Sequence, residues 1–187
     1  MRTEHPHIML WHKLKNGDQD ALGQLFTAYY PLLLRYGSKL CADKSMLEDC
    51  IQDLFAEIWQ SKSRTEVQSV QAYLLKALKY KIYKKNRTPH SQSLEDGSPA
   101  DVLFEVSHDN FMIERQEDQH KKQRIIDALQ SLSSRQREII YLRIYQELRY
   151  EEISDIMNIN YQVARNLMSQ AVKSLKKSLL SLSGWFF

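Results

Sequence analysis

Apolar residues recur at every third or fourth position along almost the whole chain, and this periodicity constrains its fold more than any other feature. A period of about 3.6 residues places apolar side chains on one face of an α-helix, where they can be buried together. Residues that interrupt helices are scarce, with 5 glycines and 4 prolines among 187 residues. The sequence therefore predicts an all-α protein, with a length that suits one medium domain or two small ones.

The first half of the chain contains four predicted helices. They run from about Pro6 to Asn16, from Asp18 to about Leu40, from Ser45 onward, and from about Ser69 to Arg87. The third is expected to begin with a capping box, because Ser45 and Glu48 have the required spacing. After the fourth, residues 88–99 contain two prolines, a glycine and several serines, a composition typical of a linker.

Helical periodicity returns after this segment. It predicts helices from about Asn110 to Leu132, from a second capping box at Ser133 and Gln136 to about Tyr145, and at about 150–157 and 161–180. We therefore expect two helical domains, at residues 6–87 and 110–182. A flexible acidic linker at 88–109 would join them.

Several classes of function are disfavoured by what the sequence lacks. Cys41 and Cys50 are too few for a disulfide framework or a zinc site, so we expect free thiols in a reducing compartment. We find neither a signal peptide nor the ~18 consecutive apolar residues of a membrane span, and we expect a cytoplasmic protein without membrane insertion. The six histidines lack metal-ligand spacing, and the sequence contains no phosphate-binding glycine loop or nucleophile motif. We accordingly expect no cofactor, no metal and no enzymatic activity.

Residues 150–172 have the pattern of a helix-turn-helix. Ile153 and Ile156 give its first helix an apolar face, and Ile159 is expected to fill the space between the two helices. Asn158 stands where the turn requires a positive φ, a conformation that asparagine tolerates. Asn160 is a favourable N-cap for the second helix.

The second helix of this motif separates apolar from polar residues. Its apolar face is predicted to contain Val163, Leu167, Ala171 and Leu175. No acidic residue follows Asp155, so the opposite face has charge of one sign, although the net charge of the chain is only +3. Such a helix fits the major groove of DNA, where arginine suits guanine and asparagine or glutamine suits adenine. We expect base contacts from Tyr161, Gln162, Arg165 and Asn166, and phosphate contacts from Lys173, Lys176 and Lys177. The alternative is an ordinary helical hairpin with a solvated polar face.

Two neighbouring helices in the first half have opposite character. Residues 71–87 combine an apolar side (Leu74, Leu75, Leu78, Ile82) with recurring aromatic rings and cations (Tyr73, Lys76, Tyr80, Tyr83, Lys84, Arg87). This combination suits unpaired DNA, because bases stack on rings and phosphates meet the charges. The helix before it is acidic and carries two large aromatic residues, which is typical of a protein-docking surface. The alternatives are that the tyrosines pack in the core, and that the acidic side is merely solvated.

Motifs in both halves resemble the sigma-70 family of RNA polymerase subunits. Residues 48–59 (EDCIQDLFAEIW) are similar to region 2.2, and residues 73–87 to the helix of regions 2.3 and 2.4. Residues 132–143 (LSSRQREIIYLR), followed by EIS at 152–154, resemble region 4. The order of the motifs and the acidic linker resemble the extracytoplasmic-function (ECF) group, which has only these two sigma domains. A stand-alone helix-turn-helix regulator is the alternative, but it leaves the acidic and the basic aromatic helices unexplained.

The resemblance implies a role for each surface. The acidic helix would bind the β′ subunit of core RNA polymerase through Asp49, Gln52, Asp53, Phe55 and Trp59. The basic aromatic helix and the loop at 61–70 would capture the melted −10 strand, with contacts from Tyr73, Lys76, Lys79, Tyr80, Tyr83, Lys84 and Arg87. The helix-turn-helix would read the −35 duplex through Arg149, Tyr161, Gln162, Arg165, Asn166, Ser169 and Lys173. The implied partners are core RNA polymerase (β′ and β subunits), promoter DNA and an anti-sigma factor.

The sequence departs from the family pattern on these same surfaces. Tyr73 replaces the usual tryptophan, and Tyr80 and Lys84 replace an asparagine and an aspartate. Arg149 replaces the Ser or Thr cap of the helix-turn-helix, which is expected to weaken the helix start by about 1 kcal/mol or to place Arg149 near a phosphate. Val163 and Ala164 stand where the family has Thr-Val. The base preferences of the family are therefore not transferred to this chain.

Overall fold

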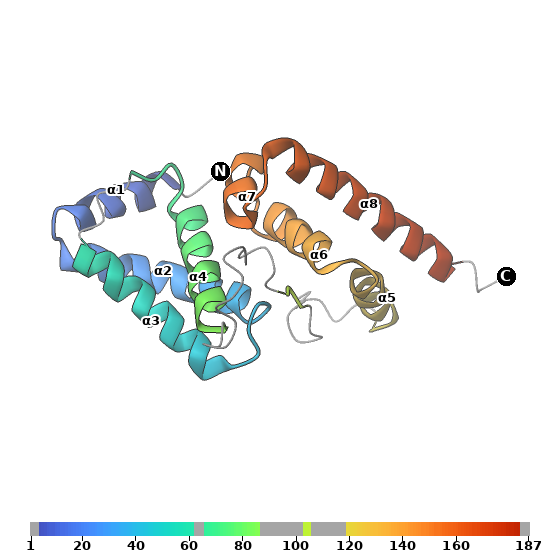
Figure 1. Cartoon of the computed structure of the whole chain (residues 1–187), viewed down its shortest axis with the longest axis horizontal. Helices are drawn as coiled ribbons and strands as arrows, with labels where there is room; N and C mark the ends of the chain where they lie inside the picture. The colour runs from blue at the N-terminus through green and yellow to red at the C-terminus, as the bar shows by residue number, and fades with distance from the viewer. Residues whose placement is uncertain (1–3, 62–65, 87–102, 106–118, 184–187) are drawn as a thin grey trace, which may run out of the picture. The chain divides into compact units, whose positions relative to one another are not determined.

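The computed structural model describes residues 4–61, 66–86, 103–105 and 119–183, and the regular structure within these ranges is entirely helical (Figure 1). The chain divides into two compact units, Met1–Val102 and Leu103–Phe187. The prediction of an all-α protein with two helical domains is confirmed. Among the described residues, none of the helices combines the length and the apolar character that crossing a bilayer requires.

The first unit is a bundle of four helices, α1 (Glu4–Lys15), α2 (Gln19–Gly37), α3 (Lys44–Ser61) and α4 (Val70–Asn86). Gly17 has a φ of +88° and allows the chain to reverse after α1. The side chain of Asp18 then caps α2 by accepting a hydrogen bond from the N–H of Ala21 at 3.0 Å. α2 packs against each of the other three helices, so its apolar stripe forms the centre of the unit.

The start of α3 differs from the prediction. The N–H of Met46 donates to Oδ1 of Asp43 at 3.0 Å, and the N–H of Leu47 donates to the carbonyl oxygen of Asp43. Asp43 is therefore the N-cap, and Ser45 lies exposed within the first turn of the helix. The predicted capping box between Ser45 and Glu48 is wrong, because an equally good capping residue stands two positions earlier.

The second unit contains α5 (Gln119–Gln130), α6 (Ser134–Ile140), a π-helical turn η4 (Tyr141–Tyr145), α7 (Tyr150–Met157) and α8 (Tyr161–Ser183). The capping box at the start of α6 is confirmed. The N–H of Gln136 donates to Oγ of Ser133 at 3.3 Å, and the N–H of Ser133 donates to Oε1 of Gln136 at 3.1 Å. The predicted end of this helix at about Tyr145 is confirmed, although its last five residues widen from α6 into the π-helical turn η4.

Three residues of the predicted linker are described, and the middle one, Phe104, packs with the second unit. Phe104 is 1% exposed, its N–H donates to Oγ of Ser134 at 2.6 Å, and its ring lies 5.5 Å from that of Tyr141. The other residues of the 88–109 segment lie outside the described ranges. Phe104 of the predicted linker therefore packs in the core of the second unit, and the bounds of the linker stay a prediction.

Candidate nucleic-acid and protein interfaces

The acidic face of α3 consists of Asp49, Gln52 and Asp53, which are exposed and share one side of the helix at i, i+3 and i+4 spacing. Trp59, two turns after Gln52, is 37% exposed. Phe55 lies at the border of this side, where it is 5% exposed and its ring meets that of Phe26 edge-on at 5.1 Å. Its ring therefore packs in the core, and its contact with a partner stays a prediction.

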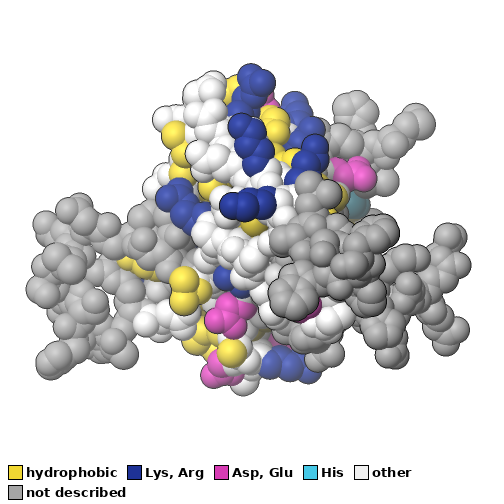
Figure 2. Space-filling view, turned by 90° about the vertical axis from the view of Figure 1, so that its right-hand side faces the viewer, with side chains coloured by type: hydrophobic (Ala, Val, Ile, Leu, Met, Phe, Trp, Pro, Cys, Tyr) yellow, Lys and Arg dark blue, Asp and Glu magenta, His cyan; other side chains and the backbone are white. Residues whose placement is uncertain are grey.

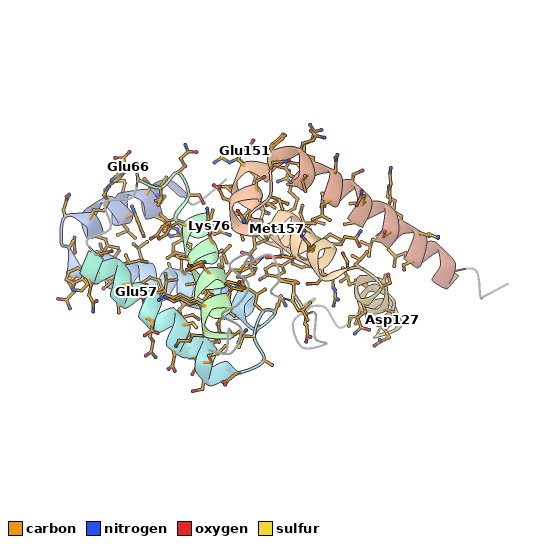
Figure 3. All side chains as sticks on the ribbon, in the orientation of Figure 1. Glu57, Glu66, Lys76, Asp127, Glu151 and Met157 are labelled. Atoms are coloured by element: carbon orange, nitrogen blue, oxygen red, sulfur yellow. The ribbon has the colours of Figure 1, made fainter. Side chains whose placement is uncertain are left out.

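Two ion pairs connect α3 to α4. Nζ of Lys85 lies 3.3 Å from Oδ2 of Asp53, and Nζ of Lys81 is paired with Oε1 of Glu57. Glu57, labelled in Figure 3, lies on the part of α3 that packs beside α4. These exposed pairs are worth about 1 kcal/mol or less, but they place the acidic face and the cations of α4 side by side.

The outer side of α4 presents the aromatic rings and cations that the sequence predicts. Lys76, labelled in Figure 3, is exposed, as is Lys84, and Tyr80 is 56% exposed. Tyr83 is half-buried, and half-buried Tyr73 packs edge-on against Trp11 with ring centroids 5.0 Å apart. We call Tyr73, Lys76, Tyr80, Tyr83 and Lys84 the basic aromatic face.

Lys79 does not belong to this face. It is 1% exposed and lies on the inner side of α4 beside Leu75, Leu78 and Ile82, each of which is fully buried. Its position in the helical repeat coincides with that of the apolar residues, and its contact with DNA stays a prediction. Arg87 and residues 62–65 of the expected −10 loop lie outside the described residues.

A pocket of about 570 Å³ opens between α3 and α4. Tyr73, Tyr80 and Lys81 line it from α4, and Glu57 and Gln60 are among the residues that line it from α3. Planar rings, a cation and an amide are the groups that stack on a nucleobase, pair with its phosphate and hydrogen-bond its edge. The pocket also holds the carboxylate of Glu57, which is paired with Lys81.

The turn of the helix-turn-helix is built as the sequence predicts. Asn158 adopts φ 51° and ψ 53° after α7, and the N–H of Ile159 donates to the carbonyl oxygen of Ser154. Oδ1 of Asn160 accepts from the N–H of Val163 at 2.8 Å and caps α8. The predictions for both asparagines are confirmed, and together they fix how α8 leaves the turn.

All seven residues predicted for the −35 surface are exposed: Arg149, Tyr161, Gln162, Arg165, Asn166, Ser169 and Lys173. The amide of Gln162 donates to Oδ1 of Asn166 at 3.1 Å, so the two amides hold each other in place on the outer side of α8. Figure 2 shows Lys and Arg side chains gathered at the top of its view, over the end of the unit where α8 lies.

A row of two rings with a cation at each end crosses the helix-turn-helix, which sequence reasoning missed. The guanidinium of Arg143 lies 5.2 Å from the ring of Tyr150, Tyr150 meets Tyr161 edge-on at 5.9 Å, and the guanidinium of Arg165 lies 5.9 Å from the ring of Tyr161. The four residues come from η4, α7 and α8, so no local spacing reveals them. The row restricts the rotamers of Tyr161 and Arg165 before any ligand binds.

The start of α7 keeps half of a capping box. The backbone N–H of Arg149 donates to Oε2 of Glu152 at 2.6 Å, and Nε of Arg149 lies 3.5 Å from the same oxygen. Arginine has no acceptor for the free N–H groups of the first turn, so the expected loss of about 1 kcal/mol relative to Ser or Thr stays a prediction. Glu151, which is labelled in Figure 3, lies in the first turn of α7 and is exposed.

The buried side of α8 differs from the prediction at one residue. Ala164 and Ala171 are fully buried and Leu167 and Leu175 are partly buried, whereas Val163 is 42% exposed. The prediction of Val163 in the apolar face is wrong, because Ala164 and Ala171 face the rest of the unit and Val163 lies at the edge of that side.

Comparisons with known proteins agree with these two units. The family model for sigma-70 region 2 matches residues 25–88, and the model for sigma-70 region 4 matches residues 122–175. The ECF RNA polymerase sigma factor SigK of Mycobacterium sp. (strain JLS) is 23% identical over 177 residues, covering 91% of this chain and 89% of the relative. SigK of Mycobacterium ulcerans (strain Agy99) is 22% identical and covers 91% of each chain.

Two solved structures share the fold. CnrH in complex with the cytosolic domain of CnrY has a TM-score of 0.60 at 16% identity, with 93% of this chain and 97% of that chain covered. The sigma factor RpoE in complex with the anti-sigma factor NepR from Bartonella quintana has a TM-score of 0.56 at 22% identity, with 84% and 95% covered. The region 2 model matches before the region 4 model along the chain, and together they span more than half of the sequence. The curated relatives are ECF sigma factors, and the match covers most of their length. The chain therefore belongs to the sigma-70 family of RNA polymerase sigma factors, in the extracytoplasmic-function group.

Proposed function

We propose that this chain binds core RNA polymerase and directs promoter-specific initiation of transcription by recognising −10 and −35 elements. The observation that carries the proposal is the placement of an acidic face and a basic aromatic face on adjacent helices of one unit, with a helix-turn-helix in the other. In this function the chain supplies promoter choice and strand capture in the cytoplasm, while RNA synthesis is performed by the polymerase, so the chain itself is not an enzyme. A stand-alone helix-turn-helix regulator is not favoured, since it would not require a region 2 unit.

The acidic face of α3 is the proposed contact with the β′ subunit. Asp49, Gln52 and Asp53 are exposed polar groups that can pair with a basic partner, and Trp59 adds a partly exposed ring at the end of the same helix. Aromatic residues at the centre of a contact with polar groups around them are typical of protein interfaces. Phe55 supports this face from the core, and the β subunit is expected to contact the chain elsewhere.

The basic aromatic face of α4 is the proposed site for the melted −10 strand. Tyr80 is the most exposed ring, and it also lines the pocket between α3 and α4 together with Tyr73. A base stacked on such a ring contributes about 1–3 kcal/mol, and Lys76 and Lys84 lie close enough along the helix to contact the phosphates.

The outer side of α8 is the proposed reader of the −35 duplex. Gln162, Arg165 and Asn166 lie in the first two turns, where a recognition helix reaches base edges, and Ser169 and Lys173 follow toward the backbone. Arg149 is exposed on the adjoining start of α7 and is a candidate for a phosphate contact. An anti-sigma factor is also a proposed partner, since the solved RpoE structure with the same fold holds one.

A pulldown with purified core RNA polymerase tests the docking assignment. The double variant Gln52→Ala, Trp59→Ala removes one side chain of the acidic face and the exposed ring near the end of α3, and it is expected to lose most of its binding to the core enzyme. Gln24→Ala removes an exposed glutamine from α2 and serves as the matched control. If the double variant keeps its helical circular dichroism and binds core polymerase as tightly as the control, the assignment is wrong.

A further inference from the structure

Val163 is an apolar side chain that the fold leaves on the DNA-facing end of α8. It is 42% exposed, while its neighbour Ala164 is fully buried and makes the contact with the unit. The hydrogen bond from its N–H to Asn160 holds Val163 in the first turn of the helix. A β-branched side chain in a helix has one dominant χ1 rotamer, so the two methyl groups of Val163 are held in a fixed direction.

The surroundings of Val163 favour one kind of ligand group. Gln162 precedes it, and Asn166 lies one turn later on the same side, so Val163 lies beside two hydrogen-bonded amides. Amides of this type suit adenine in the major groove, and the partner of adenine, thymine, presents the C5-methyl group, the apolar group that standard bases display there. An exposed apolar side chain beside amides therefore matches the major-groove edge of A·T pairs.

We propose that Val163 is a specificity residue that contacts the C5-methyl group of a thymine in the −35 element. The proposal rests on the proposed function, and it adds to the −35 surface a residue that helical periodicity places on the apolar side of α8. Contact with the methyl group would remove apolar surface of Val163 from water, a gain that cytosine and uracil, which lack this group, do not provide. The residue would thereby favour thymine without making a hydrogen bond.

Removal of a single methyl group from the DNA tests the proposal. The probe is a promoter duplex that the holoenzyme enriches from a pool with a randomised −35 segment. Each thymine of the enriched −35 element is then replaced singly by deoxyuridine, which changes only the C5-methyl group. We expect one of these replacements to weaken binding of the wild-type holoenzyme by about four-fold, the effect of burying one methyl-sized group.

The variant Val163→Ser makes the test specific to this residue. Serine lacks both γ-methyl groups of valine, and the position is exposed, so the unit is expected to fold normally. Holoenzyme with Val163→Ser should bind the thymine and the uracil form of the sensitive position equally well. Sensitivity to uracil that persists in full in this variant, or its absence from the wild-type holoenzyme, would overturn the proposal.

Arg165→Ala separates this result from a failure of the proposed function. If Arg165→Ala weakens binding to the enriched duplex while no thymine is sensitive to uracil, α8 reads the duplex and only the role of Val163 is wrong. If neither change affects binding, the assignment of α8 to the −35 element fails, and the role of Val163 fails with it.

Discussion

Among single residues, Lys39 shows most directly how burial alters a charged group. It lies just after α2, is 2% exposed, and has its pKa lowered by burial from the ordinary 10.5 to about 8. Between these values the unfolded chain holds a proton that the folded chain has lost. The free energy of unfolding therefore rises with pH across this window, because the unfolded state binds more protons.

The variant Lys39→Met is predicted to remove this pH dependence. Below about pH 8 the wild type carries the cost of a buried charge, so the variant should be more stable there. From about pH 8 to about pH 10 the difference in free energy of unfolding between the two proteins should narrow, with a slope that approaches 1 kcal/mol per pH unit. Urea unfolding of the full chain at several pH values measures this difference. If the free energy of unfolding depends on pH in the same way in both proteins, the lowered pKa is contradicted.

Phe55 and Asp53 are predicted to respond in opposite ways to substitution. Phe55→Ala leaves a cavity in the core and should lower the free energy of unfolding by about 3–5 kcal/mol. Asp53→Asn removes an exposed charge and an ion pair, so it should change stability by less than about 1 kcal/mol while weakening binding to core polymerase. Denaturation and pulldown on the same samples separate the two effects, and a stable Phe55→Ala variant would argue against the buried position.

Whether a given side chain points into the core or toward solvent was the least predictable part of the candidate site. Sequence spacing predicts Phe55 and Lys79 in binding surfaces and Val163 in an apolar face. Each of the three lies at the border between the inner and outer sides of its helix. There a rotation of a few tens of degrees decides between burial and exposure, and that rotation depends on packing against other helices. The exposed positions at the centre of each polar side, such as Gln52 and Arg165, were predictable because no such rotation buries them.

At the scale of elements, local chemistry predicts most helix ends in this chain. Asn158, Asn160 and Ser133 act through their own backbone conformation or through neighbours three residues away, so their roles follow from sequence alone. The π-helical turn η4 could not be predicted in this way. It lies where Phe104 packs on Tyr141, a contact between residues 37 positions apart, and it is followed by Glu147 with a φ of +52°.

The two candidate caps of α3 give a matched test of element boundaries. Asp43→Ala removes the observed side-chain cap and should destabilise the protein by about 1 kcal/mol. Ser45→Ala replaces an exposed residue inside the first turn with a better helix former, so stability should stay the same or rise slightly. Thermal unfolding compares the stability of the two variants. A larger loss of stability for Ser45→Ala would favour a capping box between Ser45 and Glu48 over the cap at Asp43.

At the scale of the whole molecule, the segregation of charge matters more than its total. The net charge is only +3, yet the exposed cations of α8 have no acidic neighbour later in the chain, and α3 presents its acids beside the cations of α4. Electrostatic attraction to DNA falls off within about 10 Å at 0.1 M salt, so local surfaces govern the contacts. Separate surfaces are therefore expected to bind separate partners.

The division between the two DNA surfaces is predicted to appear in separate steps of initiation. Tyr80→Ala with Tyr83→Ala removes rings from α4 and should reduce open-complex formation by at least ten-fold, given about 1–3 kcal/mol per stacked base. Binding of the holoenzyme to the −35 duplex should stay unchanged. Arg165→Ala should show the reverse order of effects, with weaker duplex binding as the first consequence. Permanganate footprinting and duplex binding measure the two steps, and equal losses in both assays for both variants would contradict the division.

The central claim is that this chain gives core RNA polymerase its choice of promoter. The most direct measurement maps the 5′ ends of RNA made in vitro on chromosomal DNA by core polymerase, with and without the purified chain. We predict that the chain creates a small set of start sites sharing two motifs at −10 and −35 spacing, and that Gln52→Ala with Trp59→Ala abolishes them. A pattern of start sites that is identical with and without the chain would contradict the account.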